Sequence, residues 1–193
     1  MALRAPIHAF APEDYLSLER SAAFKSEYID GEIVAMSGGS FAHNLIAANI
    51  AGELRAQLRQ GPCMVTNSDQ RVMILRGNFY TYPDVTVICG EPVFEDAAQD
   101  TLTNPTVIVE VLSPSTEAYD RGETFARYRL IPSLREYVLV SQDQPRVEWY
   151  IRSASGWLLQ ETGGMDGSLD LAALGCTLAL AEVYAKVAFG GAL

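Results

Sequence analysis

The sequence predicts an α/β fold in which a mixed β-sheet is flanked by helices, and three observations support this class. Runs of apolar and β-branched residues recur along the chain between Gly, Pro, Asn and Asp, as is typical of strands. One long segment after residue 40 repeats its aliphatic residues at helical spacing. The order of strand, strand, helix and strand then indicates an α/β sandwich built on one mixed sheet.

Length and composition indicate one globular domain over residues 1–193. Hydrophobic residues make up 49% of the chain and charged residues 20%. A chain of this size buries roughly 70% of its unfolded surface and needs no stabilising cross-link. No apolar run reaches the roughly 20 residues that cross a bilayer, and the N-terminus lacks the apolar core of a signal peptide. We therefore expect no membrane partner.

The three cysteines, Cys63, Cys89 and Cys176, are scattered without the spacing of a metal site. Each lies in an apolar setting, which favours buried free thiols. Free thiols are typical of a reducing compartment, so we expect a cytoplasmic protein.

The net charge is −10, which argues against a general nucleic-acid coat protein, because such proteins normally have a basic face. An enzyme with a local basic groove remains compatible with this charge. One basic cluster occupies a stretch whose only acid is Asp69: Arg55, Arg59, Arg71 and Arg76. Either a solvated mixed surface or a binding groove explains it. Lys25 and Lys186 are the only lysines.

The N-terminal third predicts a helix, a hairpin and a second helix. Pro12 begins the first helix, with acids in its first turn. Asp30-Gly31 is a favoured two-residue turn between β-prone arms. The second helix is capped by Ser40 and ends at Gly61. Its aliphatic residues recur at helical spacing: Leu45, Ile46, Ile50, Leu54 and Leu58.

The middle of the chain predicts strands around a turn at 76–78, followed by a polar loop over 91–104. The segment "PTVIVEVL" is nearly continuous in apolar residues, as expected of a central strand covered on both faces. Ser113-Pro114 ends this strand.

The last third predicts a helix, two strands, a hairpin and a short helix. Ser115 or Thr116 caps the helix in "STEAYDRGETFARYRLIP", and Gly122 costs it about 1 kcal/mol relative to Ala. Its apolar stripe is Phe125, Tyr128 and Ile131. The strands "LREYVLVS" and "RVEWYIR" flank a turn at 143–145. A hairpin around 155–156 and the helix "LAEVYAKVAF" follow.

Two of the predicted strands carry one acid each. Asp84 begins the strand in "YPDVTVIC", and Glu110 interrupts the run "VIVEVL". If these strands are neighbours, both carboxylates project from the same edge of the sheet. Two carboxylates within about 5 Å repel each other unless one is protonated or a divalent ion lies between them. The alternatives are that Asp84 only caps a turn and that Glu110 only pairs with an Arg.

Oxygen ligands at an exposed edge suit Mg²⁺, which keeps several of its waters. A Mg²⁺ held in this way can activate water and stabilise charge on a phosphoryl group. Asp84 and Glu110 are therefore candidate metal ligands.

Several segments together resemble one protein family. They are "YPDV", "VEVLSPST", "YDRGETFARYR" and "IPSLREYVLV", with "KSEYIDGEIVAMSGGSFAHNLI" before them and "LAEVYAKV" after them. They are similar to the Uma-type endonuclease-like proteins, a bacterial group within the PD-(D/E)XK nuclease superfamily. The resemblance implies a restriction-endonuclease-like core, a Mg²⁺ or Mn²⁺ site, and hydrolysis of DNA phosphodiester bonds. Asp84 matches the family's Asp, and Glu110 its motif Glu.

The catalytic lysine of the resemblance is missing. The superfamily usually places it two residues after the Glu, where this chain has Leu112. The Uma-type group takes it from the following helix, in a segment like "DRGEK", where this chain reads "DRGET" with Thr124. Threonine supplies no charge to orient the attacking water or to offset transition-state charge. Arg121, on the same helix, and Lys25 are the candidates to replace it.

Three further residues match the family pattern or lie near it. Glu32, after the hairpin turn, is either a further metal carboxylate or an exposed acid. His43, in the first turn of the long helix, either binds phosphate and stabilises the site or holds the hairpin in place. Glu27 is a possible distal ligand.

These observations support three hypotheses. The leading one is a Mg²⁺-dependent endonuclease acting on DNA. The second is a catalytically impaired nuclease-fold binding protein that has lost its lysine. The third is a structural homodimer with a vestigial site. A cation within reach of Asp84 and Glu110 would favour the first.

Overall fold

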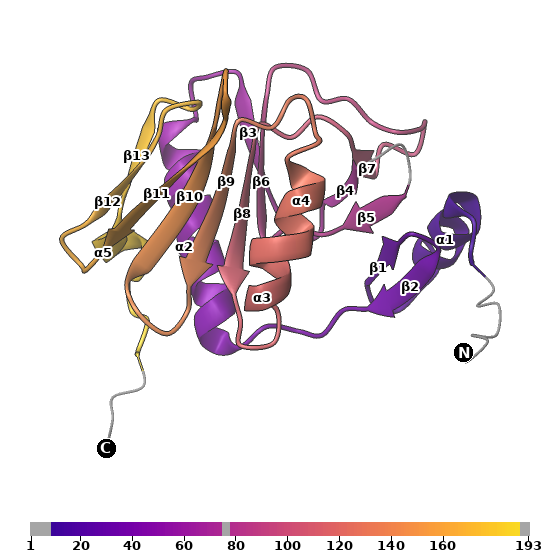
Figure 1. Cartoon of the computed structure of the whole chain (residues 1–193), viewed down its shortest axis with the longest axis horizontal. Coiled ribbons are helices and arrows are strands. Elements are labelled where there is room, and N and C mark those ends of the chain that lie inside the picture. Colours follow the sequence, from indigo (N-terminus) through magenta and orange to yellow (C-terminus); the bar gives the residue numbers. More distant parts are fainter. Residues whose placement is uncertain (1–8, 75–77, 190–193) are drawn as a thin grey trace.

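A six-stranded sheet forms the centre of the fold in this computed structural model, which describes residues 9–74 and 78–189 (Figure 1). Its strands follow in the order β11 (Gly156–Gly163), β10 (Arg146–Ser153), β9 (Glu136–Ser141), β8 (Val107–Leu112), β6 (Val85–Cys89) and β3 (Cys63–Asn67). The central strand β8 pairs parallel with β9 and antiparallel with β6. The sheet is therefore mixed, and the predicted α/β class is confirmed.

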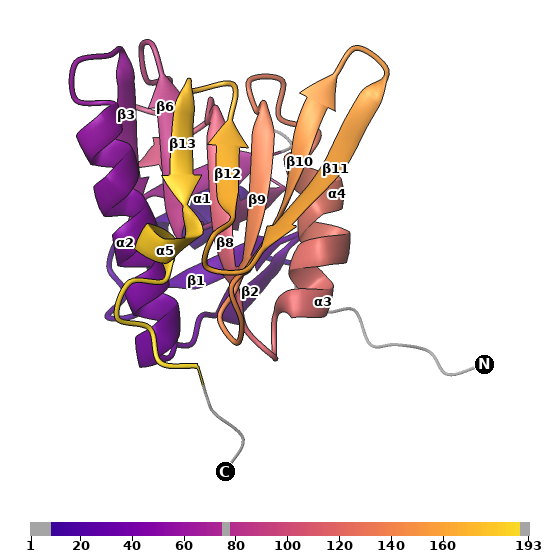
Figure 2. The same ribbon diagram turned by 90° about the vertical axis from the view of Figure 1, so that its left-hand side faces the viewer.

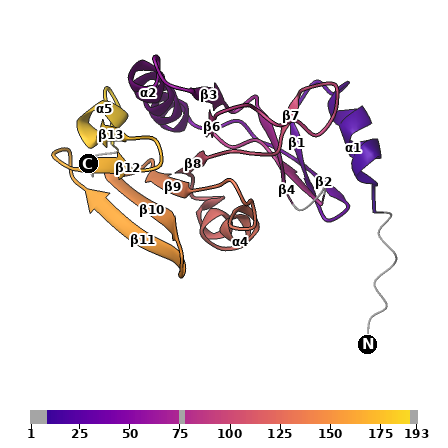
Figure 3. The same cartoon turned by 90° about the horizontal axis from the view of Figure 1, so that it is seen from above.

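Strand β8 is buried along its length except at Glu110. Because both of its faces are covered, its side chains are aliphatic on both sides, as the near-continuous apolar run predicts. The crossover from β8 to β9 runs through a helical segment on one face of the sheet (Figure 3). This segment is α3 (Glu117–Tyr119), the π-helical turn η2 (Asp120–Thr124) and α4 (Phe125–Tyr128).

The helical segment begins differently from the prediction. Thr116 stands at the N-cap of α3, but its side chain makes no capping bond. The Ser113 hydroxyl accepts the Thr116 N–H instead, at 3.2 Å. Phe125 stacks on Tyr150 with ring centroids 4.0 Å apart, so the predicted apolar stripe does face the sheet.

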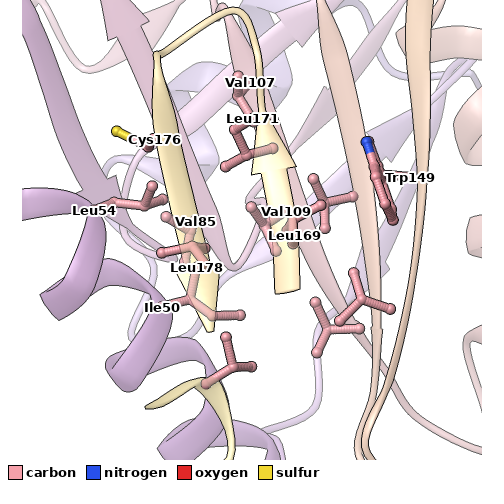
Figure 4. Packing of buried hydrophobic residues seen from close by; sticks show 14 of the residues in the cluster. Ile50, Leu54, Val85, Val107, Val109, Trp149, Leu169, Leu171, Cys176 and Leu178 are labelled. Atoms are coloured by element: carbon pink, nitrogen blue, oxygen red, sulfur yellow. The ribbon is translucent and has the colours of Figure 1, made fainter. Parts of the chain in front are cut away.

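The opposite face of the sheet is covered by helix α2 (Phe41–Gln57) and by a two-stranded sheet (Figure 2). This small sheet pairs β12 (Ser168–Leu171) with β13 (Cys176–Ala179), and α5 (Leu180–Val183) follows it. Ile50 and Leu54 of α2 pack with aliphatic residues of the strands into one core (Figure 4). The helical spacing of these side chains in the sequence reflects this burial.

The prediction of one sheet is wrong. A second, five-stranded sheet has the order β2 (Glu32–Ala35), β1 (Ser26–Ile29), β5 (Phe79–Thr81), β4 (Arg71–Ile74) and β7 (Thr101–Leu102). Helix α1 (Pro12–Glu19) packs beside it (Figure 1). The chain leaves the central sheet after β3 and returns at β6, and the predicted polar loop over 91–104 contributes β7. Hydrophobic periodicity identifies strands but does not assign them to sheets.

In the predicted turn at 76–78, Arg76 and Gly77 lie outside the described residues. None of the helices that the structure describes has the length and hydropathy needed to cross a bilayer.

The prediction of three free thiols is wrong for two of them. Cys63 and Cys89 are direct cross-strand partners of β3 and β6, with Cα atoms 4.0 Å apart, and form a disulfide. They are 26 residues apart in the sequence, so only the strand register shows that they meet. Cys176 is buried and free, as predicted. Because disulfides persist mainly in oxidising environments, the cysteines do not favour a reducing cytoplasm.

Candidate functional site

An open cavity of about 640 Å³ lies where the two larger sheets meet the start of α2 and the start of the α3–η2 segment. Each of these elements contributes polar residues to its wall. The titratable side chains that line it are Lys25, Glu27, His43, Asp84, Glu110, Tyr82, Tyr119 and Asp120. It is larger than the cavity near the end of helix α2, and most of the candidate residues identified from the sequence line it.

Asp84 and Glu110 are adjacent in the cavity wall. Val85 of β6 is the cross-strand partner of Val109 in β8, so the residues next to them lie at the same edge of the sheet. The Asp84 N–H donates to Glu110 Oε2 at 3.3 Å, and the Val111 N–H donates to Asp84 Oδ2 at 2.8 Å. Asp84 is therefore more than a turn cap, and Glu110 has no arginine partner among the described residues.

The Glu110 carboxyl is stabilised in its protonated form. Removal from solvent raises its pKa well above the usual range, and the neighbouring charge of Asp84 raises it further. The hydroxyl of Tyr128 donates to Glu110 Oε1 at 2.7 Å and opposes this shift. Tyr128 is fully buried, so it fixes the direction of the carboxyl.

His43 lies against the pair and can carry a positive charge there. Its Nε2 is 3.1 Å from Asp84 Oδ2, and this hydrogen bond raises the pKa of the imidazole. Ser40 caps α2 by accepting the His43 N–H at 3.1 Å, which anchors the histidine at the edge of the cavity. The structure therefore places His43 against the acid pair and not against the hairpin.

Two more acids share the cavity. Glu27, on β1, accepts a hydrogen bond from the Thr81 hydroxyl, and burial raises its pKa. Asp120 begins the π-helical turn, and its pKa is raised to about 6, first by burial and then by the charges of Asp84 and Glu27. π-helical turns are rare and are often found at functional sites.

Asp120 is the residue that sequence reasoning missed. It lies four residues before Thr124 in the segment "DRGET", and both side chains line the cavity. On a helix, residues four apart share a face, so the position of Thr124 could have identified Asp120.

Arg121 faces away from the cavity. It pairs with Glu117 at 2.9 Å and with Glu148 of β10, and it is absent from the cavity wall. The expectation that it shares a face with Thr124 is therefore wrong, because two carboxylates hold its guanidinium on the other side of the helix.

Lys25 is part of the cavity wall, but its ammonium group is already engaged. It donates to the Ser68 carbonyl oxygen at 2.8 Å and to Asp69 Oδ1 at 3.1 Å. Thr124 also lines the cavity, with only 3% of its surface exposed. Glu32 is exposed at the start of β2 and lies outside the cavity wall, so the structure separates it from the pair.

Comparisons with known proteins identify the family of this chain. Residues 12–181 match the Uma2 family, described as "Putative restriction endonuclease". The uncharacterized protein slr1290 of Synechocystis is 39% identical over 96% of each chain. A second Synechocystis protein, sll1609, is 39% identical over 81% of this chain and 89% of its own length.

A solved structure shares the fold. It is the crystal structure of a "putative nuclease belonging to DUF820" from Anabaena variabilis, with a TM-score of 0.75. The similarity covers 95% of this chain and 100% of that one, at 16% sequence identity. The match to the family over most of the chain, with two relatives of nearly equal length, shows that this chain belongs to the Uma2 family of restriction-endonuclease-like proteins.

Proposed function

We propose that this protein is a Mg²⁺-dependent endonuclease that hydrolyses phosphodiester bonds in DNA. One observation carries the proposal: Asp84 and Glu110 adjoin each other at the edge of the central sheet and line an open cavity. Membership of a nuclease family supports it.

The donor atoms of the pair fit a hard divalent cation. Among the described residues, no three His, Cys, Asp or Glu side chains converge as a closed metal site requires. Two carboxylates at an open cavity suit Mg²⁺, which retains several waters and prefers oxygen ligands. Burial and the charge of Asp84 raise the pKa of Glu110, and a cation bound between the two carboxylates would favour its ionised form. A bound Mg²⁺ would supply positive charge to a phosphoryl group and would promote ionisation of water.

The surrounding residues orient the pair and balance its charge. The Val111 N–H and His43 hold Asp84, while Tyr128 holds Glu110. The imidazole of His43 carries a proton more readily than usual, so it can stabilise negative charge on a phosphate oxygen. Asp120, with a pKa of about 6, gains or loses a proton near neutral pH and suits protonation of the leaving oxygen.

A second candidate function is binding of nucleic acid without cleavage. It is favoured by Thr124, which stands at the lysine position and brings no charge into the cavity. Arg121 does not replace the lysine, and Lys25 is bonded to Ser68 and Asp69. A protein with this second function keeps the nuclease fold and the acid pair but lacks the rate enhancement that the lysine would supply.

A homodimer is the assembly that we propose. The edge strand β11 exposes Leu158 by 54% and Leu159 by 50%, one on each face of the sheet. Exposed apolar edge strands tend to pair with another chain. Sedimentation should then give a dimer for the wild type and a monomer for Leu158→Lys. A wild-type monomer would contradict the assembly.

Cleavage of DNA tests the function directly. We expect supercoiled plasmid to be nicked or linearised in Mg²⁺ or Mn²⁺, and we expect EDTA to prevent this. Asp84→Asn and Glu110→Gln should abolish cleavage, whereas Glu32→Gln, an acid outside the cavity, should keep it. Activity that survives Asp84→Asn would count against the proposed site. Metal binding without cleavage by the wild type would favour the second candidate function.

A further inference from the structure

Helix α2 carries an outward-facing stripe that the acid pair does not use. Its positions are spaced three and four apart, which places them on one side of a helix. The stripe consists of Phe41, Asn44, Ala48, Gly52, Arg55 and, just beyond the helix end, Arg59; all six are exposed. Phe41 is 83% exposed, and an aromatic ring left so open is unusual in a folded protein. We call these six residues the α2 stripe.

The α2 stripe connects two cavities. His43 and Asn44, at the start of the helix, line the cavity that contains the acid pair. Ala51 and Arg55, near its end, line a second cavity of about 380 Å³. The turn between β3 and β4 divides the two cavities: Ser68 lines the first, while Asn67, Asp69 and Gln70 line the second.

The charge along the α2 stripe suits a polyanion. Arg55 and Arg59 form no ion pair with any described carboxylate, in contrast to Arg20, Arg121 and Arg146. The one acid of α2, Glu53, lies about 100° around the helix from Gly52. The acid of the second cavity, Asp69, is already paired with Lys25. In a protein of net charge −10, two adjacent free arginines mark a local site for an anion.

The middle of the α2 stripe is flat because its residues are small. Ala48 and Gly52 project little from the helix, and a Cβ added at Gly52 would meet nothing within 4 Å. A chain lying along α2 can therefore approach its backbone closely. From Asn44 to Arg55 the helix rises roughly 16 Å, so an extended single strand can lie along it.

We infer that the α2 stripe binds single-stranded nucleic acid, which runs along the helix from the acid-pair cavity to the second cavity. A base stacks on Phe41, and backbone phosphates meet Arg55 and Arg59. Stacking on aromatic rings combined with phosphate contacts is the usual mode of binding for single strands. This inference rests on the proposed function because it takes nucleic acid as the ligand, but it concerns binding and not cleavage.

Binding of a fluorescein-labelled dT oligonucleotide to the full chain at low salt, in EDTA, tests the inference. Removing both arginines (Arg55→Gln with Arg59→Gln) should weaken binding at least tenfold. It should also reduce the slope of log K against log salt by about 1.4, because each single-strand phosphate contact contributes about 0.7. Phe41→Ala should weaken binding several-fold with the salt slope unchanged.

Gly52→Glu provides an independent variant. There is space for its side chain, and replacing a glycine within a helix favours folding, so a loss of binding would not reflect unfolding. Gly52→Ala and Arg129→Gln are the matched controls and should bind like the wild type. Arg129 is exposed and follows α4, on the opposite face of the sheet.

The inference is overturned if the wild type does not bind the oligonucleotide, or if the arginine and Gly52→Glu variants bind like their controls. Cleavage assays keep it separate from the proposed function. Binding along the α2 stripe without any cleavage would refute the enzyme and leave the inference intact. Cleavage that is unaffected in these variants would refute the inference and leave the proposed enzyme intact.

Discussion

Replacing Asp120 by Asn should stabilise the metal-free protein at neutral pH. The pKa of Asp120 is raised to about 6, mainly by burial, from an ordinary value of about 3.9. The unfolded chain therefore ionises this group at lower pH than the folded chain does. A raised folded-state pKa means that the stability from this group is fully present below about pH 4 and is lost as the pH rises through about 6.

The size of the effect follows from the same values. At about 1.4 kcal/mol per pH unit, the interval from about 3.9 to about 6 corresponds to about 3 kcal/mol in the free energy of unfolding. Asp120→Asn removes the ionisable group, so it should gain up to about 3 kcal/mol over the wild type at pH 7. At pH 3.5, where Asp120 is protonated in both states, the two proteins should differ little.

Urea unfolding in EDTA at pH 3.5, 5 and 7 measures this difference. Asp100→Asn is the matched control, because two hydrogen bonds from Arg20 lower the pKa of Asp100. This control should lose stability at pH 7, which is the opposite sign, and most of that loss should remain at pH 3.5, because the pKa of folded Asp100 lies well below that pH. If Asp120→Asn is no more stable than the wild type at pH 7, or gains equally at every pH, the argument from burial fails.

Three further outcomes are expected. Mg²⁺ should raise the melting temperature of the wild type and of Glu32→Gln but not of Asp84→Asn, as measured by calorimetry; an equal rise in all three would contradict metal binding at the pair. Thr124→Lys should increase Mg²⁺-dependent cleavage by about 10²–10³-fold in a plasmid assay, because it restores a cation in the cavity wall. This gain must disappear when Asp84→Asn is added. Alkylation after unfolding without reductant should label one thiol, Cys176, by mass spectrometry, and Cys63→Ser should cost about 2–4 kcal/mol in urea unfolding. Labelling of three thiols without reductant would contradict the disulfide.

The features that the sequence predicted well depend on local patterns. The apolar run around Glu110 identified the central strand, because a strand covered on both faces has no polar alternation. The same pattern made its single acid conspicuous, and the structure places Asp84 beside it. The helical spacing of Ile46, Ile50 and Leu54 likewise identified α2.

The features that it missed depend on contacts between distant segments. Nothing local shows that β3 and β4 belong to different sheets, or that Cys63 faces Cys89. The direction of Arg121 is set by Glu148, which lies 27 residues further along the chain. Asp120 was overlooked for a different reason: an acid in a helix looks ordinary until burial and neighbouring charges are known.

The junction of the two large sheets divides the cavity wall into two parts that come from different sheets. Asp84, Glu110 and Tyr128 belong to the central sheet and the helix that covers it, whereas Lys25 and Glu27 come from the β1 side of the five-stranded sheet. Changes in that smaller sheet can therefore reshape one side of the cavity while the strands that carry the acid pair stay in place. If this cavity is the active site that we propose, exchanging residues 25–35 between relatives should change the substrate preference and leave the acid pair in place.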